Sequence, residues 1–173
     1  MNRTIQIVNS TQEDLETIFT FYDYAIAHQK KVSDQHWQGF DRALIRKEIN
    51  EQRQYKILVK QQIACIFVVT FGDPEIWQER NTSPAIYLHR IVTHPHFRGY
   101  GFVKRITDWA IEFAKNNELA YVRLDTWASN KKLGSHYLSC GYALAGTISI
   151  QADSTLPKHY AGIILQLFEI KVQ

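Results

Sequence analysis

Residues 91–104 read IVTHPHFRGYGFVK, and this stretch decides the interpretation of the whole sequence. Its first residues predict the end of a strand, residues 94–101 predict a loop, and a helical apolar pattern begins at Phe102. Gly99 and Gly101 allow a tight turn and let the backbone approach a ligand closely. Because the first N–H groups of a helix have no internal partners, this arrangement predicts an anion pocket at a helix N-terminus.

The loop matches neither of two common phosphate-binding motifs. A Walker loop requires Gly-Lys-Ser or Gly-Lys-Thr after a four-residue gap, and the sequence contains no such triplet. A dinucleotide-binding loop requires three glycines, whereas this loop has only Gly99 and Gly101. Two glycines alone predict no more than a turn, so the function of the loop must be inferred from the residues around it.

The apolar patterns on both sides of the loop predict a chain of alternating helices and strands. Ser10 and Glu13 have the form of a capping box, so a helix is expected to begin there. The predicted helices are 10–26, 40–52, a helix from 102 onward and 133–139, and the predicted strands are 55–59, 63–71, 85–93, 121–126, 142–145 and 161–170. The order α-α-β-β-β-α-β-α-β-β indicates a mixed sheet with interleaved helices. Since no linker is visible, we predict one domain over residues 1–173.

The composition argues against several classes of protein. The chain has 173 residues, of which 45% are hydrophobic and 21% charged, as in ordinary globular domains. The longest apolar run, 63–69, is too short to cross a membrane, and the N-terminus lacks an apolar signal segment. We therefore expect a cytoplasmic protein without a membrane partner. The net charge of +3 comes from scattered basic residues, so no nucleic-acid partner is expected.

The spacing of the cysteines and histidines does not indicate a metal-binding site. Cys65 and Cys140 fit neither a zinc site nor a redox pair, so we expect free thiols in a reducing cytoplasm. His94 and His96 lie in the loop and, even with His89, lack convincing further ligands. No metal is therefore expected.

Residues 98–103, RGYGFV, resemble the signature of the GCN5-related N-acetyltransferases (GNAT), which is Arg/Gln-x-x-Gly-x-Gly/Ala directly after a strand and opening a helix. One position departs from the pattern, because Val103 stands where Gly or Ala is usual. The family commonly carries an Asn after the next strand, a Tyr seven residues later, and then Gly followed by an aromatic residue. Asn130, Tyr137, Gly141 and Tyr142 occupy these positions. The detailed resemblance covers residues 87–142.

The resemblance implies the α/β fold of the acyl-CoA N-acyltransferases, with a mixed, mostly antiparallel central sheet flanked by helices. It implies a single N-acetyltransferase domain over residues 1–173 that moves an acetyl group from acetyl-CoA, the co-substrate, to a primary amine of a small molecule or peptide. The amine would attack the thioester directly in a ternary complex, without a covalent enzyme intermediate. A homodimer is compatible with this resemblance.

For the co-substrate, the resemblance implies contacts from the loop and from the strand before it. Arg98 would pair with a phosphate oxygen of coenzyme A, and the residues after it would contribute backbone N–H groups. The end of the strand would supply the edge along which the pantetheine arm lies. Asn130 either caps the short helix or contacts the co-substrate. The expected cofactor-binding residues are Ile91, Val92, Thr93, Arg98, Gly99, Tyr100, Gly101, Phe102, Val103 and Asn130.

His89 is the candidate general base. Strand alternation places His89 on one face with Ile91 and Thr93, which match the family's cofactor-facing residues. Many family members carry a glutamate base two residues before the first of these, and His89 occupies that position. An imidazole with a pKa of about 6.5 can accept a proton from a substrate ammonium, directly or through water. The alternative is a strand histidine with a purely structural hydrogen bond.

Tyr137 is the candidate general acid. Attack of an amine on the thioester expels a thiolate, which needs a proton. A phenol with a pKa of about 10 stays protonated at neutral pH and can still donate to a basic thiolate. The family uses a tyrosine at this spacing. The alternative is a tyrosine on an amphipathic helix that packs against the sheet.

A second function stays open on the sequence. Val103, in place of Gly or Ala, also suits a non-catalytic acyl-CoA-binding sensor or regulatory protein with the same fold. Turnover of acetyl-CoA with an amine distinguishes the enzyme from the sensor, whereas the sequence does not identify the amine.

Overall fold

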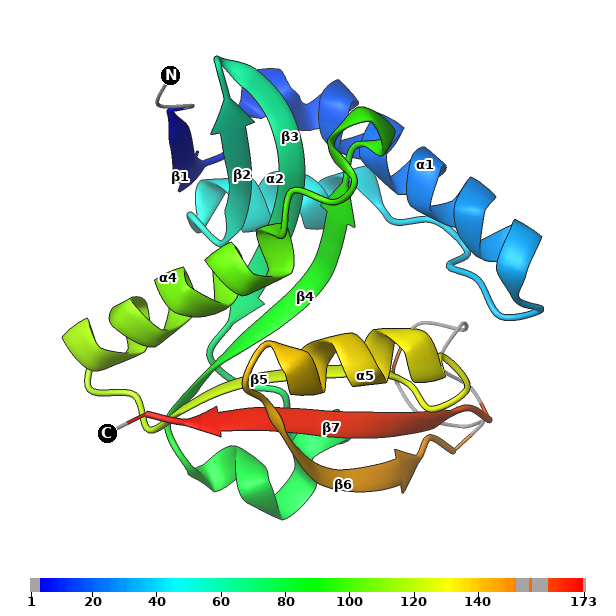
Figure 1. Ribbon diagram of the computed structural model, residues 1–173, viewed down its shortest axis with the longest axis vertical. Helices are drawn as coiled ribbons and strands as arrows, with labels where there is room; N and C mark the ends of the chain where they lie inside the picture. The colour runs from blue at the N-terminus through cyan, green and yellow to red at the C-terminus, as the bar shows by residue number, and fades with distance from the viewer. Residues whose placement is uncertain (1–3, 152–155, 157–161, 173) are drawn as a thin grey trace. The chain divides into compact units, whose positions relative to one another are not determined.

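The strands form one seven-stranded sheet in the order β1-β2-β3-β4-β5-β7-β6 (Figure 1). The computed structural model describes residues 4–151, residue 156 and residues 162–172. The strands are β1 (Ile5–Asn9), β2 (Gln54–Val59), β3 (Gln62–Thr70), β4 (Ala85–Thr93), β5 (Tyr121–Trp127), β6 (Ala143–Ser149) and β7 (Ile164–Lys171). β4 and β5 pair in parallel, whereas β1–β2, β2–β3, β5–β7 and β6–β7 pair antiparallel. The predicted α/β class with a mixed, mostly antiparallel sheet is confirmed.

Helices alternate with the strands along the chain. They are α1 (Leu15–Val32), α2 (Arg42–Asn50), α3 (Pro74–Trp77), α4 (Phe102–Asn116) and α5 (Lys131–Ser139), with the short 3-10 helices η1 (Gln12–Asp14), η2 (Gln78–Thr82) and η3 (Pro95–Phe97). The sequence did not predict α3, because a single turn begun by a proline gives no helical apolar period. None of the described helices is long and apolar enough to cross a membrane.

The start of the chain differs from the prediction. β1 was not predicted, because only five residues form it and their burial is partial. The capping box predicted at Ser10 and Glu13 is wrong by one residue, since Thr11 and Asp14 form it. The reason is that Ser10 ends the strand: its N–H donates to the carbonyl of Gln54 at 2.8 Å and the residue is buried.

Two predicted strand boundaries also shift. The turn predicted between the strands at 55–59 and 63–71 is confirmed, and Lys60 and Gln61 both adopt positive φ, as two-residue hairpin turns require. β6 begins one residue later and extends four residues further than the predicted strand 142–145. β7 matches most of the strand predicted at 161–170, whereas residue 161 lies outside the described residues.

The chain divides into two compact units. The first comprises residues 1–69 and 90–102, and the second comprises residues 70–89 and 103–173. The single domain over residues 1–173 stays a prediction. The core of the first unit is built from apolar faces of two helices and two strands: Leu15, Ile18, Phe21 and Tyr22 of α1, Ile45 and Ile49 of α2, Ile66 of β3 and Val92 of β4.

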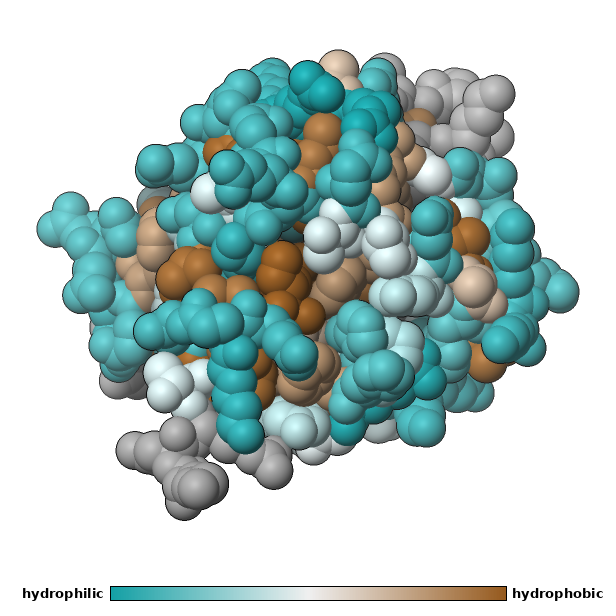
Figure 2. Space-filling model, turned by 90° about the horizontal axis from the view of Figure 1, so that it is seen from above, coloured by the Kyte–Doolittle hydropathy of each residue, from teal (hydrophilic) through white to brown (hydrophobic). Residues whose placement is uncertain are grey.

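The second unit has its own core, which positions the strand segments that carry the candidate acid–base residues. Its buried members are Ile76, Trp77, Ala85, Tyr87, Ile150, Ile163, Leu165 and Leu167. α5 lies along β7 (Figure 1), and the ring of Tyr137 in α5 contacts the ring of Phe168 in β7 edge to face. The face drawn in Figure 2 is covered mainly by hydrophilic residues, with hydrophobic residues visible in its middle.

Candidate active site

The glycine loop has the backbone that the sequence predicts. η3 is followed by Gly99 and Gly101, with φ of 84° and 72°, and α4 begins at Phe102. This left-handed conformation strains any residue with a side chain, so the glycines are required here. A Cβ built on either glycine would meet no atom within 4 Å, so the backbone faces open space. Such a loop before a helix can receive the oxygens of a phosphate on its N–H groups.

The charge around this loop favours an anion. Arg98 is exposed, and among the described residues it forms no ion pair. The first turn of α4 contains no acidic residue. Val103, which departs from the GNAT signature, is half-buried, and its carbonyl accepts a hydrogen bond from Thr107 Oγ1 at 2.8 Å. An anion is therefore favoured at this loop, whereas binding of coenzyme A by these residues stays a prediction.

The residues between β4 and the glycines anchor the loop. The N–H of His94 donates to the carbonyl of Ala64 at 2.8 Å, and the imidazole accepts a hydrogen bond from the N–H of His96. The His94 ring also packs against Phe21 and Tyr24. Burial, followed by the neighbouring His96, lowers the pKa of His94. His94 therefore has a structural role in the loop.

β4 contains a break in its extended backbone. Arg90 has a φ of 48°, which is rare outside glycine and costs roughly 1–3 kcal/mol. The regular alternation that predicts His89 and Ile91 on one strand face is therefore interrupted between them. β4 and β5 pair in parallel over three residues, beginning with Ala85 opposite Tyr121. β4 then continues beyond this paired segment.

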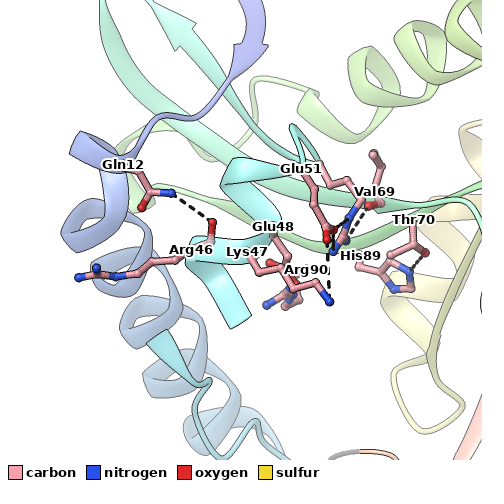
Figure 3. A network of polar contacts seen from close by, with 10 residues as sticks. Gln12, Arg46, Lys47, Glu48, Glu51, Val69, Thr70, His89 and Arg90 are labelled. Carbon is pink, nitrogen blue, oxygen red and sulfur yellow. Dashed lines mark hydrogen bonds and ion pairs between the residues drawn. The ribbon is translucent and has the colours of Figure 1, made fainter. Parts of the chain in front are cut away.

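An ion pair within the first unit holds Arg90. Its guanidinium pairs with the carboxylate of Glu48 in α2 (Figure 3). The same guanidinium lies over the rings of Phe40 and Tyr22, 4.8 and 5.5 Å from their centres. Charge pairing and two cation–π contacts thus offset the backbone strain at Arg90.

Of the predicted strand-edge residues, Val92 is buried, and Ile91 and Thr93 are half-buried. Thr93 Oγ1 donates to Cys65 Sγ at 3.7 Å. Burial raises the pKa of Cys65 to about 12, so this thiol is unreactive, and the prediction of free cysteines is confirmed.

The second unit gathers polar side chains around His89. His89 Nε2 and Thr70 Oγ1 form a hydrogen bond of 2.8 Å (Figure 3). One imidazole nitrogen and one oxygen each from Asp73 and Asp125 lie within 4.8 Å of one another. Asp73 precedes α3 and Asp125 lies in β5, so three separate segments meet here. We call Asp73, His89 and Asp125 the Asp–His–Asp cluster.

Both carboxyl groups of the cluster have raised pKa values. Burial raises the pKa of Asp125 to about 7, with a further contribution from the charge of Asp73. Burial raises the pKa of Asp73 to about 6, and the charge of Glu75 adds to the shift. Carboxyl groups with such pKa values exchange protons near neutral pH, as acid–base catalysis requires.

The charge of Asp125, a member of this cluster, affects the pKa of Tyr137. It is buried, and its ring contacts Tyr142 and Phe168 edge to face. Burial raises its pKa above the ordinary phenol value, with smaller contributions from Tyr142, Asp125 and Cys140. The packing alternative for Tyr137 is therefore present in the structure, and so is the protonated phenol that a general acid needs. Its catalytic role stays a prediction.

Asn130 caps α5, because its side-chain oxygen accepts a hydrogen bond from the N–H of Leu133 at 3.1 Å. This confirms the capping alternative, whereas contact with the co-substrate stays a prediction. Sequence reasoning did not select Asp73 or Asp125. The one available signal was a charged residue at Asp125 within an apolar strand, and Asp73 looked like an ordinary turn residue in Gly-Asp-Pro.

Comparisons with known proteins identify the family and match the fold. The model of the acetyltransferase (GNAT) family matches residues 13–142. The uncharacterized N-acetyltransferase YesJ of Bacillus subtilis is 32% identical over 74 residues, which are 43% of this chain and 41% of that protein. A GNAT-family acetyltransferase from Listeria monocytogenes has a TM-score of 0.77 at 19% identity, covering 97% of this chain and 95% of its own. The yncA structure from Salmonella typhimurium, solved with its cofactor acetyl-CoA, has a TM-score of 0.70 at 11% identity, covering 98% and 95%.

Proposed function

Because the chain belongs to the GNAT family of acetyltransferases, we propose that it transfers the acetyl group of acetyl-CoA to a primary amine of a small molecule or peptide. The family match covers both the glycine loop and the residues around His89 and Tyr137. A solved structure with the same fold contains acetyl-CoA, which supports acetyl-CoA as the co-substrate.

The binding of acetyl-CoA rests on the loop and on the end of β4. The open glycine backbone and exposed Arg98 would hold the diphosphate, with further N–H groups from residues 99–103. Backbone groups of residues 91–93 would hold the pantetheine arm. A strand N–H directed at the thioester oxygen would stabilise the negative charge that develops there. Alignment of the amine and the thioester in one site would lower the entropic cost of bringing the two reactants together.

The reaction requires the nitrogen to lose two protons and the sulfur to gain one. The amine arrives as an ammonium and loses its first proton to His89, after which its nitrogen attacks the thioester carbon. The new C–N bond forms, the C–S bond breaks, and the nitrogen releases its second proton to water. Tyr137 gives its proton to the departing thiolate, and coenzyme A leaves as a thiol. The proton on His89 then returns to Tyr137 through water, which restores both groups.

The observation that carries this proposal is the position of Asp125. An oxygen of Asp125 lies within 4.8 Å of a nitrogen of His89, and its charge also contributes to the raised pKa of Tyr137. The candidate base and the candidate acid thus share one carboxyl neighbour in the second unit. Asp125, which was not predicted from the sequence, thus lies near both residues that the family resemblance selects.

A thiol-release assay with acetyl-CoA and a panel of amines tests the function. The panel should include small metabolite amines, polyamines and peptides with free N-termini. We expect at least one amine to raise thiol release well above the hydrolysis measured without acceptor. Tight binding of coenzyme A without release for any amine would instead support the non-catalytic sensor.

A further inference from the structure

The left-handed backbone of Arg90 is unusual because of where it lies. Among the described residues other than glycine that have a positive φ, Arg90 is the one inside a strand. The others lie in turns or at helix ends, where left-handed residues usually occur: Gln52, Lys60, Gln61, Gln78 and Glu118. Strain inside a regular element persists only where the surrounding structure holds it, and such strain concentrates at functional sites. The position of Arg90 within β4 therefore points to a functional role.

Stability alone does not explain the ion pair that holds Arg90. Its partner Glu48 lies in α2, and both side chains are largely buried (Figure 3). One carboxylate oxygen of Glu48 and one guanidinium nitrogen of Arg90 are shielded from solvent and form no hydrogen bond within the described part of the chain. Two desolvated charges with unsatisfied atoms usually stabilise a fold no better than apolar side chains of similar size. What the pair does provide is a fixed backbone at residue 90.

The segment 91–93, which follows Arg90, is anchored at both ends within the first unit. At one end, α2 holds Arg90 through Glu48. At the other end, the N–H of His94 donates to the carbonyl of Ala64 in β3 at 2.8 Å. The middle residue of the segment is buried in the core of this unit. The backbone of segment 91–93 thus depends on both anchors, and Glu48 supplies the one at the strained end.

We propose that Glu48 and Arg90 are positioning residues for coenzyme A: their ion pair holds residue 90 left-handed and so aligns the backbone groups of segment 91–93 with the pantetheine arm. This inference rests on the proposed function, which assigns the pantetheine arm to this segment. A change of residue 90 from left-handed to extended reorients the peptide group that joins it to residue 91. Because hydrogen bonds weaken steeply when donor and acceptor are misaligned, such a change weakens the hold on the arm. Both residues act through the backbone, and neither side chain has to touch the ligand.

Two ligands that differ by the pantetheine arm test this positioning without turnover. Coenzyme A contains the arm, and 3′-phospho-ADP is the same molecule without it. Calorimetry gives the Kd of each. Glu48→Gln should weaken the binding of coenzyme A at least about tenfold, as expected for the loss of one or two hydrogen bonds, and that of 3′-phospho-ADP less than about threefold. A general loss of structure would instead weaken the binding of both ligands equally.

A pair of double variants separates the backbone of residue 90 from the buried charges. Glu48→Gln with Arg90→Gly removes both charges and leaves a residue that adopts a positive φ without strain. Glu48→Gln with Arg90→Ala removes the same charges and retains the strain. The glycine variant should bind coenzyme A at least about threefold more tightly than the alanine variant, since only glycine reaches the left-handed conformation freely. Neither double variant contains an unbalanced buried charge, so this pair provides the test if Glu48→Gln alone does not fold.

Ile57→Ala is the control for lost stability. Ile57 is fully buried in β2, a strand that does not pair with β4. Its truncation leaves a cavity and costs stability of the same order as an unbalanced buried charge. This variant should nevertheless keep the wild-type Kd for both ligands. Thermal denaturation of every variant fixes a temperature at which all of them are folded during calorimetry.

Three outcomes would overturn the positioning role. The first is unchanged coenzyme A affinity in Glu48→Gln. The second is an equal loss of affinity for coenzyme A and 3′-phospho-ADP, which would assign the ion pair a purely structural role. The third is equal coenzyme A affinity in the two double variants, which would show that the φ of residue 90 does not matter for the site. Absence of thiol release with every amine would contradict the proposed function alone, because the positioning is measured by binding.

Discussion

Glu48 and Arg90 form a buried ion pair in which a helix residue holds the one residue of β4 that leaves the extended conformation (Figure 3). Their side chains are only 5% and 12% exposed. One guanidinium nitrogen of Arg90 and one carboxylate oxygen of Glu48 have no hydrogen-bond partner among the described residues. The pair is therefore held by one charged hydrogen bond and by the two cation–π contacts of its guanidinium, and Arg90 directly follows His89 in the chain.

Removing this carboxylate should be costly. Glu48→Gln leaves the Arg90 charge buried and unbalanced, so we expect a loss of about 3–5 kcal/mol in the free energy of unfolding. Glu51→Gln is the control, because Glu51 pairs with Arg53 at a more exposed position and should cost no more than about 1 kcal/mol. Urea denaturation measures both. Equal losses in the free energy of unfolding would show that the buried Glu48–Arg90 pair stabilises the protein no more than the exposed pair does.

Tyr137→Phe removes one oxygen and keeps the ring contacts with Phe168 and Tyr142. If the phenol protonates the thiolate, kcat should fall by roughly 10²–10⁴-fold, with little change in acetyl-CoA affinity. Tyr142→Phe is the matched control, since it removes a hydroxyl bonded to Thr107 at 3.0 Å and should lower stability rather than kcat. A kcat within about threefold of wild type for Tyr137→Phe would exclude it as the acid.

Gly101→Glu should abolish coenzyme A binding while the protein stays folded. A Cβ at this position meets no atom within 4 Å, so only backbone strain at φ 72° opposes the side chain, whereas its negative charge would repel a phosphate. Gly162→Glu has the same φ and the same open space, and it serves as the control for strain. Unchanged affinity in calorimetry would contradict the assignment of the loop.

Asp125 should make the protein less stable as pH rises. Its pKa is raised from 3.8 to about 7 in the folded state, so the folded protein binds a proton more tightly than the unfolded chain does. Stability should therefore fall between pH 4 and pH 7 and level off above, because each pKa unit corresponds to about 1.4 kcal/mol. Asp125→Asn should be more stable than wild type at pH 8 and similar at pH 4. Thermal denaturation across this range measures the difference, and a parallel pH dependence of variant and wild type would refute it.

His89→Ala should lower kcat most at pH values where the wild-type imidazole is neutral and can act as the base. The pH–rate profile should report the whole cluster, since burial raises the pKa values of Asp73 to about 6 and of Asp125 to about 7. His28→Ala, which removes an exposed imidazole from α1, should leave the pH–rate profile unchanged. If His89 has only a structural role, its variant loses stability and retains the shape of the profile.

The sequence by itself determined the parts of this protein that local chemistry specifies. Gly99 and Gly101 indicated a left-handed loop before a helix, because only glycine adopts those φ angles without strain. The apolar period indicated α4, whose Ile106 and Ala110 are fully buried. The same local spacing pointed to the family, which is confirmed, and selected Tyr137 as the candidate acid, whose role stays a prediction.

Tertiary structure alone decided which polar groups meet. Asp73, His89 and Asp125 come from a loop and two strands that are separated by up to fifty-two residues, and no local pattern relates their side chains. The pKa values of the two carboxyl groups depend on burial and on neighbouring charges, which a sequence does not contain. The same is true of Arg90, whose unusual φ is stabilised by a partner forty-two residues away in the chain. Long-range packing, rather than local propensity, selects such contacts, and for that reason the chemistry of the cluster appeared only in the folded chain.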